Sequence, residues 1–453
     1  MVVAVALCLA LVVTACRDDA GPESTSASTS TTTAEKKSGD VGTLTDVCQE
    51  GSPSGSPAPG VTPTSITVGT FSDPSAQFRP GLNQELFDVA TVFSQWCNDR
   101  GGINGRKVVV NQHDAALFNV KARMTEACRD DFMLVGGGAV FDQDGVETRL
   151  QCLLPDIAAY TVSTKARGAD LLAPAIPNSL EVINVGPLQY LHDKYPAATQ
   201  RMGLLTGDVN TTKAVADQIR GIARDELGMT FVYDDVYPAV GISTWTPYAQ
   251  KLKDTKTRGL IWIGEPESLA ELLDALREVG HELDFVRTDA NHYDRKLVDA
   301  AGTSLEDAPV YVHTGYAPFE GADPSSPTGQ YLAAFEQYLP DGKRHTGLAI
   351  AAWSAWLLFA KSAGSCGNDL TRRCVYETAR ATEGWTGGGL HAPSGRPCFT
   401  IEKATPDGFV LVEDAGANED IYTCRERAAV QVDVDPSEYT TLADVGRSMD
   451  ELR

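Results

Sequence analysis

The chain has 453 residues, a formal net charge of −23 at pH 7 and ten cysteines. Its acidic residues are scattered rather than gathered in blocks, and no basic face is evident. Nucleic-acid binding requires such a face for phosphate contacts and is therefore disfavoured. We interpret the acidity as a contribution to solubility.

Residues 1–16 form an apolar, uncharged segment, MVVAVALCLALVVTAC. A membrane-spanning helix needs about 20 apolar residues, so the segment better fits the hydrophobic region of a signal peptide. Its last residues, Val13–Cys16, resemble the bacterial lipobox, in which the cysteine is diacylated and becomes the new N-terminus. We expect lipidation at Cys16 and an extracytoplasmic protein anchored to the outer face of the cell membrane. No lysine or arginine precedes the apolar run, so the position of the start methionine stays open.

Residues 17–60 are rich in Ser, Thr, Pro and Gly. They contain too few apolar side chains to offset the conformational entropy lost on folding, so we predict a disordered tether. The rest of the chain is too long for one typical core, since single cores stop growing near about 250–300 residues. Two lobes are therefore predicted, followed by a polar C-terminal tail at 429–453.

The first folded segment predicts a βαβ unit. Residues 66–70 form a β-branched run typical of a buried strand, and 107–111 form a second strand. Between them lies a helical stripe with steps of four, three, four and three residues: Leu82, Leu86, Val89, Phe93 and Trp96. Gly101 and Gly102 end this helix. Units of this kind build parallel sheets whose loops at the strand C-termini hold ligands.

The alternation of strands and helices continues along the chain. Further strands are predicted at 132–135, 157–162, 202–205, 231–233, 260–263, 285–287, 310–313, 398–402 and 409–412. Further helices are predicted at 146–154, 211–226, 267–279, 346–361 and 374–383. The apolar helix at 346–361 is too short to span a membrane, so we interpret it as a buried core helix.

The segment 66–114 resembles the start of the type I periplasmic binding proteins, specifically the leucine/isoleucine/valine-binding branch. Gly69–Ala76 is similar to the ligand loop G-x-x-S-G-P-x-A, and Asn98–Lys107 is similar to N-x-x-G-G-I-x-G-R/K-x. The resemblance continues more loosely to about residue 425. It implies an α/β fold of two Rossmann-like lobes with parallel sheets, joined by a three-strand hinge. Lobe 1 is expected at 61–180 and 309–385, and lobe 2 at 181–308 and 386–428.

Eight cysteines remain once Cys8 leaves with the signal peptide and Cys16 carries lipid. An even number in an exported chain indicates disulfides, although the sequence allows many pairings. The leucine-binding branch of the family has a disulfide in about the place of Cys128–Cys152. The selected pairs are Cys128–Cys152, Cys366–Cys374, Cys398–Cys424 and, by elimination, Cys48–Cys97. Metal binding is the competing interpretation, and the lack of any CxxC pair counts against it.

Motifs for catalysis are largely missing from the sequence. It contains no GxSxG elbow, no HExxH and no P-loop. Gly136–Gly138 follow a strand, but the GxGxxG pattern would require glycine at position 141, which is Phe141. We therefore predict a protein that is not an enzyme and that needs no cofactor or metal.

The resemblance implies a ligand site at the strand ends of both lobes. In lobe 1 it comprises an aromatic wall at Phe78, the loop residues Val140 and Phe141, and the hydroxyl pair Ser163 and Thr164. In lobe 2 it comprises Asn210, Thr211, Glu265 and Asp289, the last expected to hold an ammonium group. Alternatives stay open, because Phe78 also suits a surface aromatic, Ser163 and Thr164 suit helix caps, and Asp289 suits a solvated loop acid.

Two departures from the family alter this expected site. Ala139–Asp142 replaces a serine-rich run that grips the ligand carboxylate, and Asp142 would repel an anion. The family's hinge-side tyrosine is also missing at Asn210 and Thr211. We expect a lipid-anchored solute-binding protein that captures a small polar ligand, such as an amino acid or related amine, for an ABC permease. The alternatives are a receptor-like sensor of the same fold and a lipoprotein hydrolase.

Overall fold

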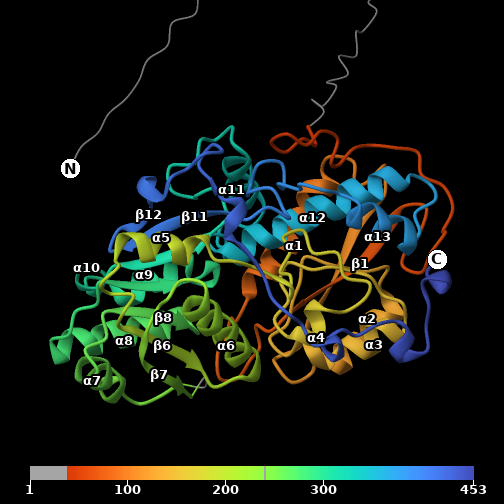
Figure 1. Cartoon of the computed structure of the whole chain (residues 1–453). Coiled ribbons are helices and arrows are strands. Elements are labelled where there is room, and N and C mark those ends of the chain that lie inside the picture. The colour runs from red at the N-terminus through yellow and green to blue at the C-terminus, as the bar shows by residue number, and fades with distance from the viewer. Residues whose placement is uncertain (1–37, 239–240) are drawn as a thin grey trace, which may run out of the picture. The chain divides into compact units, whose positions relative to one another are not determined.

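The computed structural model describes residues 38–238 and 241–453, without the side chains of Asn210, Thr211 and Glu426. Two sheets, each covered by helices on both faces, form two lobes (Figure 1). The predicted signal peptide and Cys16 lie outside the described residues. Within the described part of the chain, no helix is both long enough and apolar enough to cross a membrane.

Lobe 1 is built on a parallel sheet with strand order β2-β1-β3-β4. Helices α1 and α12 pack on one face, and α2 and α3 pack on the other. The strands are β1 (Ser65–Ser72), β2 (Lys107–Asp114), β3 (Leu134–Val135) and β4 (Asp156–Ile157). The helices are α1 (Gln84–Asn98), α2 (Val120–Asp130), α3 (Val146–Gln151), α4 (Thr164–Arg167), α11 (Pro327–Tyr338), α12 (Gly347–Cys366) and α13 (Arg372–Arg380).

The predicted βαβ unit is confirmed, and β1 pairs with β2 in parallel over its whole length. The predicted apolar stripe of α1 is buried, including Leu86, Val89 and Phe93. After α1 the chain turns at Gly102, where φ is +79° and a Cβ atom would lie 2.1 Å from the Arg106 carbonyl oxygen. Only glycine fits this turn, which explains the sharp end of the helix.

Helix α12 is the predicted core helix. It is apolar on nearly every side, and almost all of its residues are buried. A helix that is apolar all round belongs in the interior of a protein. Its Trp353 and Trp356 pack against Phe93 of α1, with ring centroids 5.3 Å away in each case.

Lobe 2 contains a larger sheet with strand order β12-β11-β10-β9-β8-β6-β7. Strands β6 to β10 are parallel, whereas β11 and β12 are antiparallel. Helices α5 and α6 cover one face, and α7, α8 and α9 cover the other. The strands are β6 (Met202–Gly207), β7 (Phe231–Tyr237), β8 (Gly259–Ile263), β9 (Phe285–Thr288), β10 (Val310–Thr314), β11 (Cys398–Thr405), β12 (Gly408–Leu411) and β13 (Thr423–Cys424). The helices are α5 (Gly186–Lys194), α6 (Asn210–Asp225), α7 (Thr246–Asp254), α8 (Pro266–Val279), α9 (Arg295–Ala301) and α10 (Ser304–Asp307).

Strand β10 lies in the sheet of lobe 2, although the expected boundary at 309 places it in lobe 1. It pairs with β9 on one side and β11 on the other. Val310 and Val312 are fully buried there, as expected for an apolar run in the interior of a sheet. The chain therefore crosses to lobe 1 after β10, reaches α11 to α13, and returns before β11.

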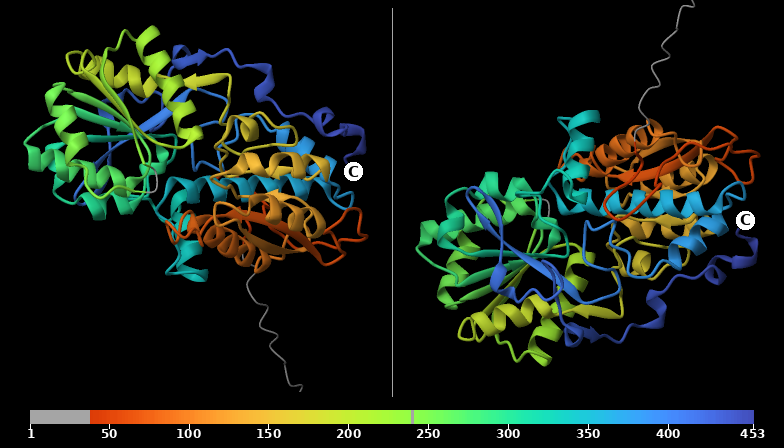
Figure 2. Two further views of the ribbon diagram at one scale, coloured as in Figure 1. Left: turned by 90° about the horizontal axis from the view of Figure 1, so that it is seen from below. Right: turned by 90° about the horizontal axis from the view of Figure 1, so that it is seen from above.

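Residues 429–453, predicted as a polar tail, cross back to lobe 1 (Figure 2). They begin with β14 (Ala429–Gln431), which pairs antiparallel with β5 (Val182–Asn184). At the far end, the backbone N–H of Arg372 donates to the Arg453 carbonyl oxygen. The tail thus adds a connection between the lobes beyond the three that the family resemblance implies.

Residues 38–60 also differ from the prediction, which placed them in the disordered tether. Val41 and Val47 are buried in the core of lobe 1, and Cys48 is bonded to Cys97 of α1. The prediction rested on the average composition of 17–60, which does not reveal that a few apolar residues and one disulfide hold residues 38–60 against lobe 1. The segment is therefore ordered against lobe 1 from residue 38 onward.

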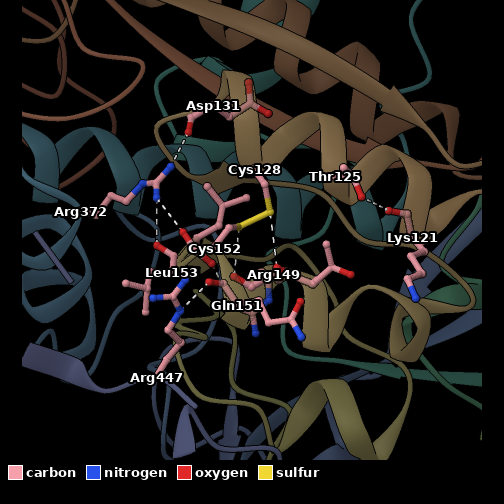
Figure 3. The surroundings of a disulfide bond; sticks show 12 residues. Lys121, Thr125, Cys128, Asp131, Arg149, Gln151, Cys152, Leu153, Arg372 and Arg447 are labelled. Carbon is pink, nitrogen blue, oxygen red and sulfur yellow. Dashed lines mark hydrogen bonds between the residues drawn. A yellow bond between two sulfur atoms is a disulfide. The ribbon is translucent and has the colours of Figure 1, made fainter. Parts of the chain in front are cut away.

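All four selected disulfides occur in the structure: Cys48–Cys97, Cys128–Cys152, Cys366–Cys374 and Cys398–Cys424. Figure 3 shows the surroundings of Cys128–Cys152, which joins α2 to the end of α3. Beside it, the guanidinium of Arg372 donates to the carbonyl oxygens of Asp131, Cys152 and Leu153. The bridge and this arginine together fix α2 and α3 against α13.

Candidate functional site

The loops at the C-terminal ends of the parallel strands bring the two lobes into contact. Arg79 lies in the loop after β1 and forms ion pairs with Glu265 and Glu267, which follow β8. In parallel α/β sheets, ligands bind at this edge. The region where these two edges meet is therefore the candidate ligand site.

A second cationic bridge joins the two lobes. Lys343, between α11 and α12, lies 3.0 Å from a carboxylate oxygen of Glu85 and 3.1 Å from one of Asp294. Burial alone would lower the pKa of Lys343, but the two carboxylates raise it. The lysine thus stays charged and links lobe 1 to the segment that precedes α9.

The loop Gly136–Gly138 after β3 is shaped by close packing. A Cβ atom on these glycines would lie 2.4 Å from the Trp356 indole, the Phe71 backbone and the Tyr160 ring, respectively. These close contacts account for the three consecutive glycines, so a phosphate-binding role is not needed to explain them.

The backbone amides of the lobe-1 loops are bonded within the protein. Asp73 accepts hydrogen bonds from the N–H groups of Leu117 and Val140. Asp142 accepts from Val162 at 2.7 Å and from Ser163 at 3.1 Å. Burial raises the pKa of both carboxyl groups. The predicted strand 157–162 is consequently short, because its last amides bind Asp142 and not a neighbouring strand.

The hydroxyl pair after β4 is likewise engaged in the protein. The Ser163 hydroxyl caps α4 by accepting the Ala166 N–H at 3.0 Å. The Thr164 hydroxyl donates to the carboxylate of Glu438, in the C-terminal segment. The capping role that the sequence left open for Ser163 is thus confirmed.

The predicted aromatic contacts of lobe 1 lie at its surface. Phe78 is 67% exposed. Phe141 stacks on Phe118 with ring centroids 5.5 Å apart, and Phe118 is itself exposed. Val140 is half-buried beside them. These aromatic rings present an apolar surface without an enclosed pocket.

Lobe 2 contributes a polar cluster at the ends of β9 and β10. Asp289 caps the turn after β9 by accepting the Asn291 N–H at 3.1 Å, and it lies 3.5 Å from His292 Nδ1. Arg287 lies within β9, and its Nη2 is 3.1 Å from His313 Nε2 of β10. Burial alone would raise the pKa of Asp289, but His292 and Arg287 lower it well below its usual range.

Arg79, Arg287 and His313 were not among the site residues predicted from the sequence. A signal for Arg287 existed, because a charged residue stands inside the predicted strand 285–287. Of the residues predicted from the sequence, Glu265 contacts Arg79 of lobe 1, and Asp289 lies directly after the C-terminal end of β9. The side chains of Asn210 and Thr211 lie outside the described part, and only their place at the start of α6 is known.

Two cavities lie away from these residues. A small one of about 50 Å³ lies inside lobe 1, lined by Phe71, Met124, Asp142 and Tyr160 among others. A more open one of about 560 Å³ lies on the hinge side, lined by Pro318, Phe409, Val410 and Ile421 among others. Neither includes the charged groups that join the lobes.

A serine–histidine contact in lobe 1 is buried and structural. Ser354 Oγ lies 2.8 Å from His391 Nε2 and also accepts the Trp385 indole N–H. His391 donates from Nδ1 to the Ala392 carbonyl oxygen, and burial lowers its pKa to about 4. Since the serine is inaccessible to a substrate, the pair does not favour hydrolysis.

One group of potential metal ligands is present among the described residues. It comprises Cys398, Cys424 and Glu419. The two sulfur atoms are joined in a disulfide, and a disulfide sulfur is not a thiolate ligand. This group therefore does not indicate a metal centre.

Two lobes whose strand-end loops meet are the arrangement of the type I periplasmic binding protein fold. The sequence profile of the family described as "Periplasmic binding protein" matches residues 188–409, from α5 to β12. The chain has the fold of the type I periplasmic binding proteins, and its segment 188–409 is similar in sequence to that family. The comparison with curated protein sequences gives no match.

Solved structures with the same fold include substrate-binding proteins of ABC transporters. The fatty acid ABC transporter substrate-binding protein from Thermomonospora curvata is 17% identical, with a TM-score of 0.65, and the alignment covers 80% of this chain and 95% of that chain. The branched-chain amino acid transporter substrate-binding protein LivJ from Streptococcus pneumoniae, in complex with isoleucine, is 14% identical, with a TM-score of 0.61 and coverages of 77% and 100%. At such identities the similarity establishes the fold.

Proposed function

We propose that the chain is the solute-binding lipoprotein of an ABC importer, which captures a small polar ligand between its lobes. The contact of Arg79 with Glu265 and Glu267 is the observation that carries this proposal. It shows that the strand-end loops of the two lobes reach each other, as closure over a ligand requires. The structural relatives that bind fatty acid or isoleucine support this class of function.

The ligand-binding residues remain those expected from the sequence. Phe78, Val140 and Phe141 would supply apolar contact, while Ser163, Thr164, Asn210, Thr211 and Glu265 would supply polar contact. Asp289 would hold an ammonium group, and its lowered pKa keeps the carboxylate ionised for that role. Anchoring through Cys16 would hold the protein beside the permease.

Native mass spectrometry of the protein purified without added ligand tests the proposal. We expect a bound small molecule, and its removal should change the small-angle scattering profile as the lobes separate. A protein that carries no small molecule and keeps one scattering profile under all conditions would contradict a binding function. The variant Asp289→Asn should lose about 30-fold or more in affinity for an amine ligand.

A further inference from the structure

Arg287 is a buried cation whose hydrogen-bonding capacity is mostly unused. Its side chain stands in the apolar strand β9, and the residue is only 6% exposed. Among the described residues, its Nε and Nη1 atoms have no hydrogen-bond partner. Burying a charged group without hydrogen-bond partners costs free energy. A bound ligand that supplies the missing acceptors would explain why this arginine is buried.

His313 holds this guanidinium in place without adding charge. His313 Nδ1 lies 2.7 Å from the Thr288 carbonyl oxygen, so Nδ1 carries the proton and donates it. Nε2 is then an acceptor for the Nη2–H of Arg287 at 3.1 Å. Burial, together with the charge of Arg287, lowers the pKa of His313 to about 3, so the imidazole is neutral.

The strand register places Arg287 on the sheet face toward α5 and α6, near the C-terminal ends of the parallel strands. Arg287 pairs with Ile261 of β8, and Ile261 in turn pairs with the next strand, β6. On the same face, at the end of β6, the buried hydroxyl of Thr206 also lacks a partner among the described residues. This edge of the sheet leads into the loop where Glu265 contacts Arg79.

Lobe 1 has little left to offer an anion. The amides of Val140, Val162 and Ser163 are bonded to the protein's own carboxyl groups, Asp73 and Asp142. A ligand carboxylate would have to displace them. In lobe 2, by contrast, Arg287 and Thr206 retain polar atoms without a hydrogen-bond partner among the described residues.

We infer that the ligand carries a carboxylate and that Arg287 binds it in lobe 2, with the Thr206 hydroxyl as a further donor. This inference rests on the proposed function and names the chemical class of its ligand. Asp289 follows two residues later with a carboxylate side chain that is 36% exposed. The site therefore accommodates either a simple carboxylic acid or an amino acid whose ammonium group binds Asp289.

Calorimetry with matched acids and amides tests the inference. The probes are octanoate against octanamide, and isoleucine against isoleucinamide. Wild type should bind at least one acid and bind its amide at least tenfold more weakly. Arg287→Met should lower the affinity for that acid about 30-fold or more, since a charge-assisted partner is lost from a desolvated site. Arg258→Met is the matched control, because Arg258 pairs with Asp284 at the opposite edge of the same sheet.

The unliganded variant separates a binding role from a structural one. Because Arg287 is buried and largely unpartnered, Arg287→Met should unfold at the same temperature as wild type or a higher one. A lower unfolding temperature with unchanged acid affinity would make the arginine structural and overturn the inference. Equal binding of acid and amide by wild type, or no binding of either acid, would overturn it as well. If mass spectrometry then finds a neutral or cationic ligand, the binding function stands and only the carboxylate is refuted.

Discussion

Arg79 Nη2 lies 2.5 Å from Glu267 Oε2, so this ion pair links the loop after β1 in lobe 1 to the start of α8 in lobe 2. Glu265 contacts the same guanidinium. Burial opposes ionisation of Glu267, but the charge of Arg79 lowers its pKa. The pair therefore stabilises the joined state above that lowered pKa and loses its effect as the pH falls through it.

Arg79→Ala should shift the lobes toward separation. The pair is partly exposed, so its loss should cost up to about 1 kcal/mol, or roughly fivefold in the closing equilibrium. Small-angle scattering, or fluorescence transfer between dyes on the two lobes, would measure the change. Arg277→Ala is the control, because Arg277 pairs with Asp307 within lobe 2. Equal scattering by both variants and wild type would show that the ion pair does not influence closure.

The buried carboxyl group of Glu402 should make the folded protein less stable against unfolding as the pH rises. This carboxyl group on β11 is completely buried, and burial raises its pKa from 4.5 to about 8. The unfolded chain releases the proton near pH 4.5, so stability is highest below that pH and falls until about pH 8. Glu402→Gln should flatten this decline and raise the thermal midpoint at pH 8 more than at pH 5. The exposed Glu336→Gln is the control, and an equal response of both variants would refute the buried-acid explanation.

The disulfides should contribute unequally to stability. The bridge Cys48–Cys97 closes 49 residues and Cys366–Cys374 closes 8. Chain-entropy arguments give about 4 kcal/mol for the longer loop and about 2.5 kcal/mol for the shorter one. Paired serine substitutions, followed by denaturant unfolding, would measure this order. A larger loss for the short loop would show that local packing, and not chain entropy, decides the contribution.

Cys16 predicts membrane attachment. Cys16→Ala expressed in a bacterium should leave the membrane fraction, whereas wild type should carry the mass of a diacylglycerol group. Intact mass spectrometry and detergent partition would measure both. Equal partition of the two proteins, with no added lipid mass, would disprove the anchor.

Local sequence patterns determined the order and type of most elements. The stripe of α1, the apolar run of α12 and the short β-branched strands are periodic signals that each report burial along one segment. The four predicted cysteine pairs occur in the structure, and the family resemblance led to the correct fold. The predicted tether failed at 38–60 because two valines and one cysteine, and not the average composition, decide whether that segment packs.

Only the tertiary structure decided which side chains meet. The sequence selected Asp289, but not Arg287 two residues earlier, because a lone arginine in an apolar strand shows neither its burial nor its missing partners. Likewise, Asp142 was expected to repel a ligand, yet in the structure it binds the amides of Val162 and Ser163. Hydrogen-bond partners and desolvation depend on distances between segments far apart in the chain, and periodicity within one segment carries no information about them.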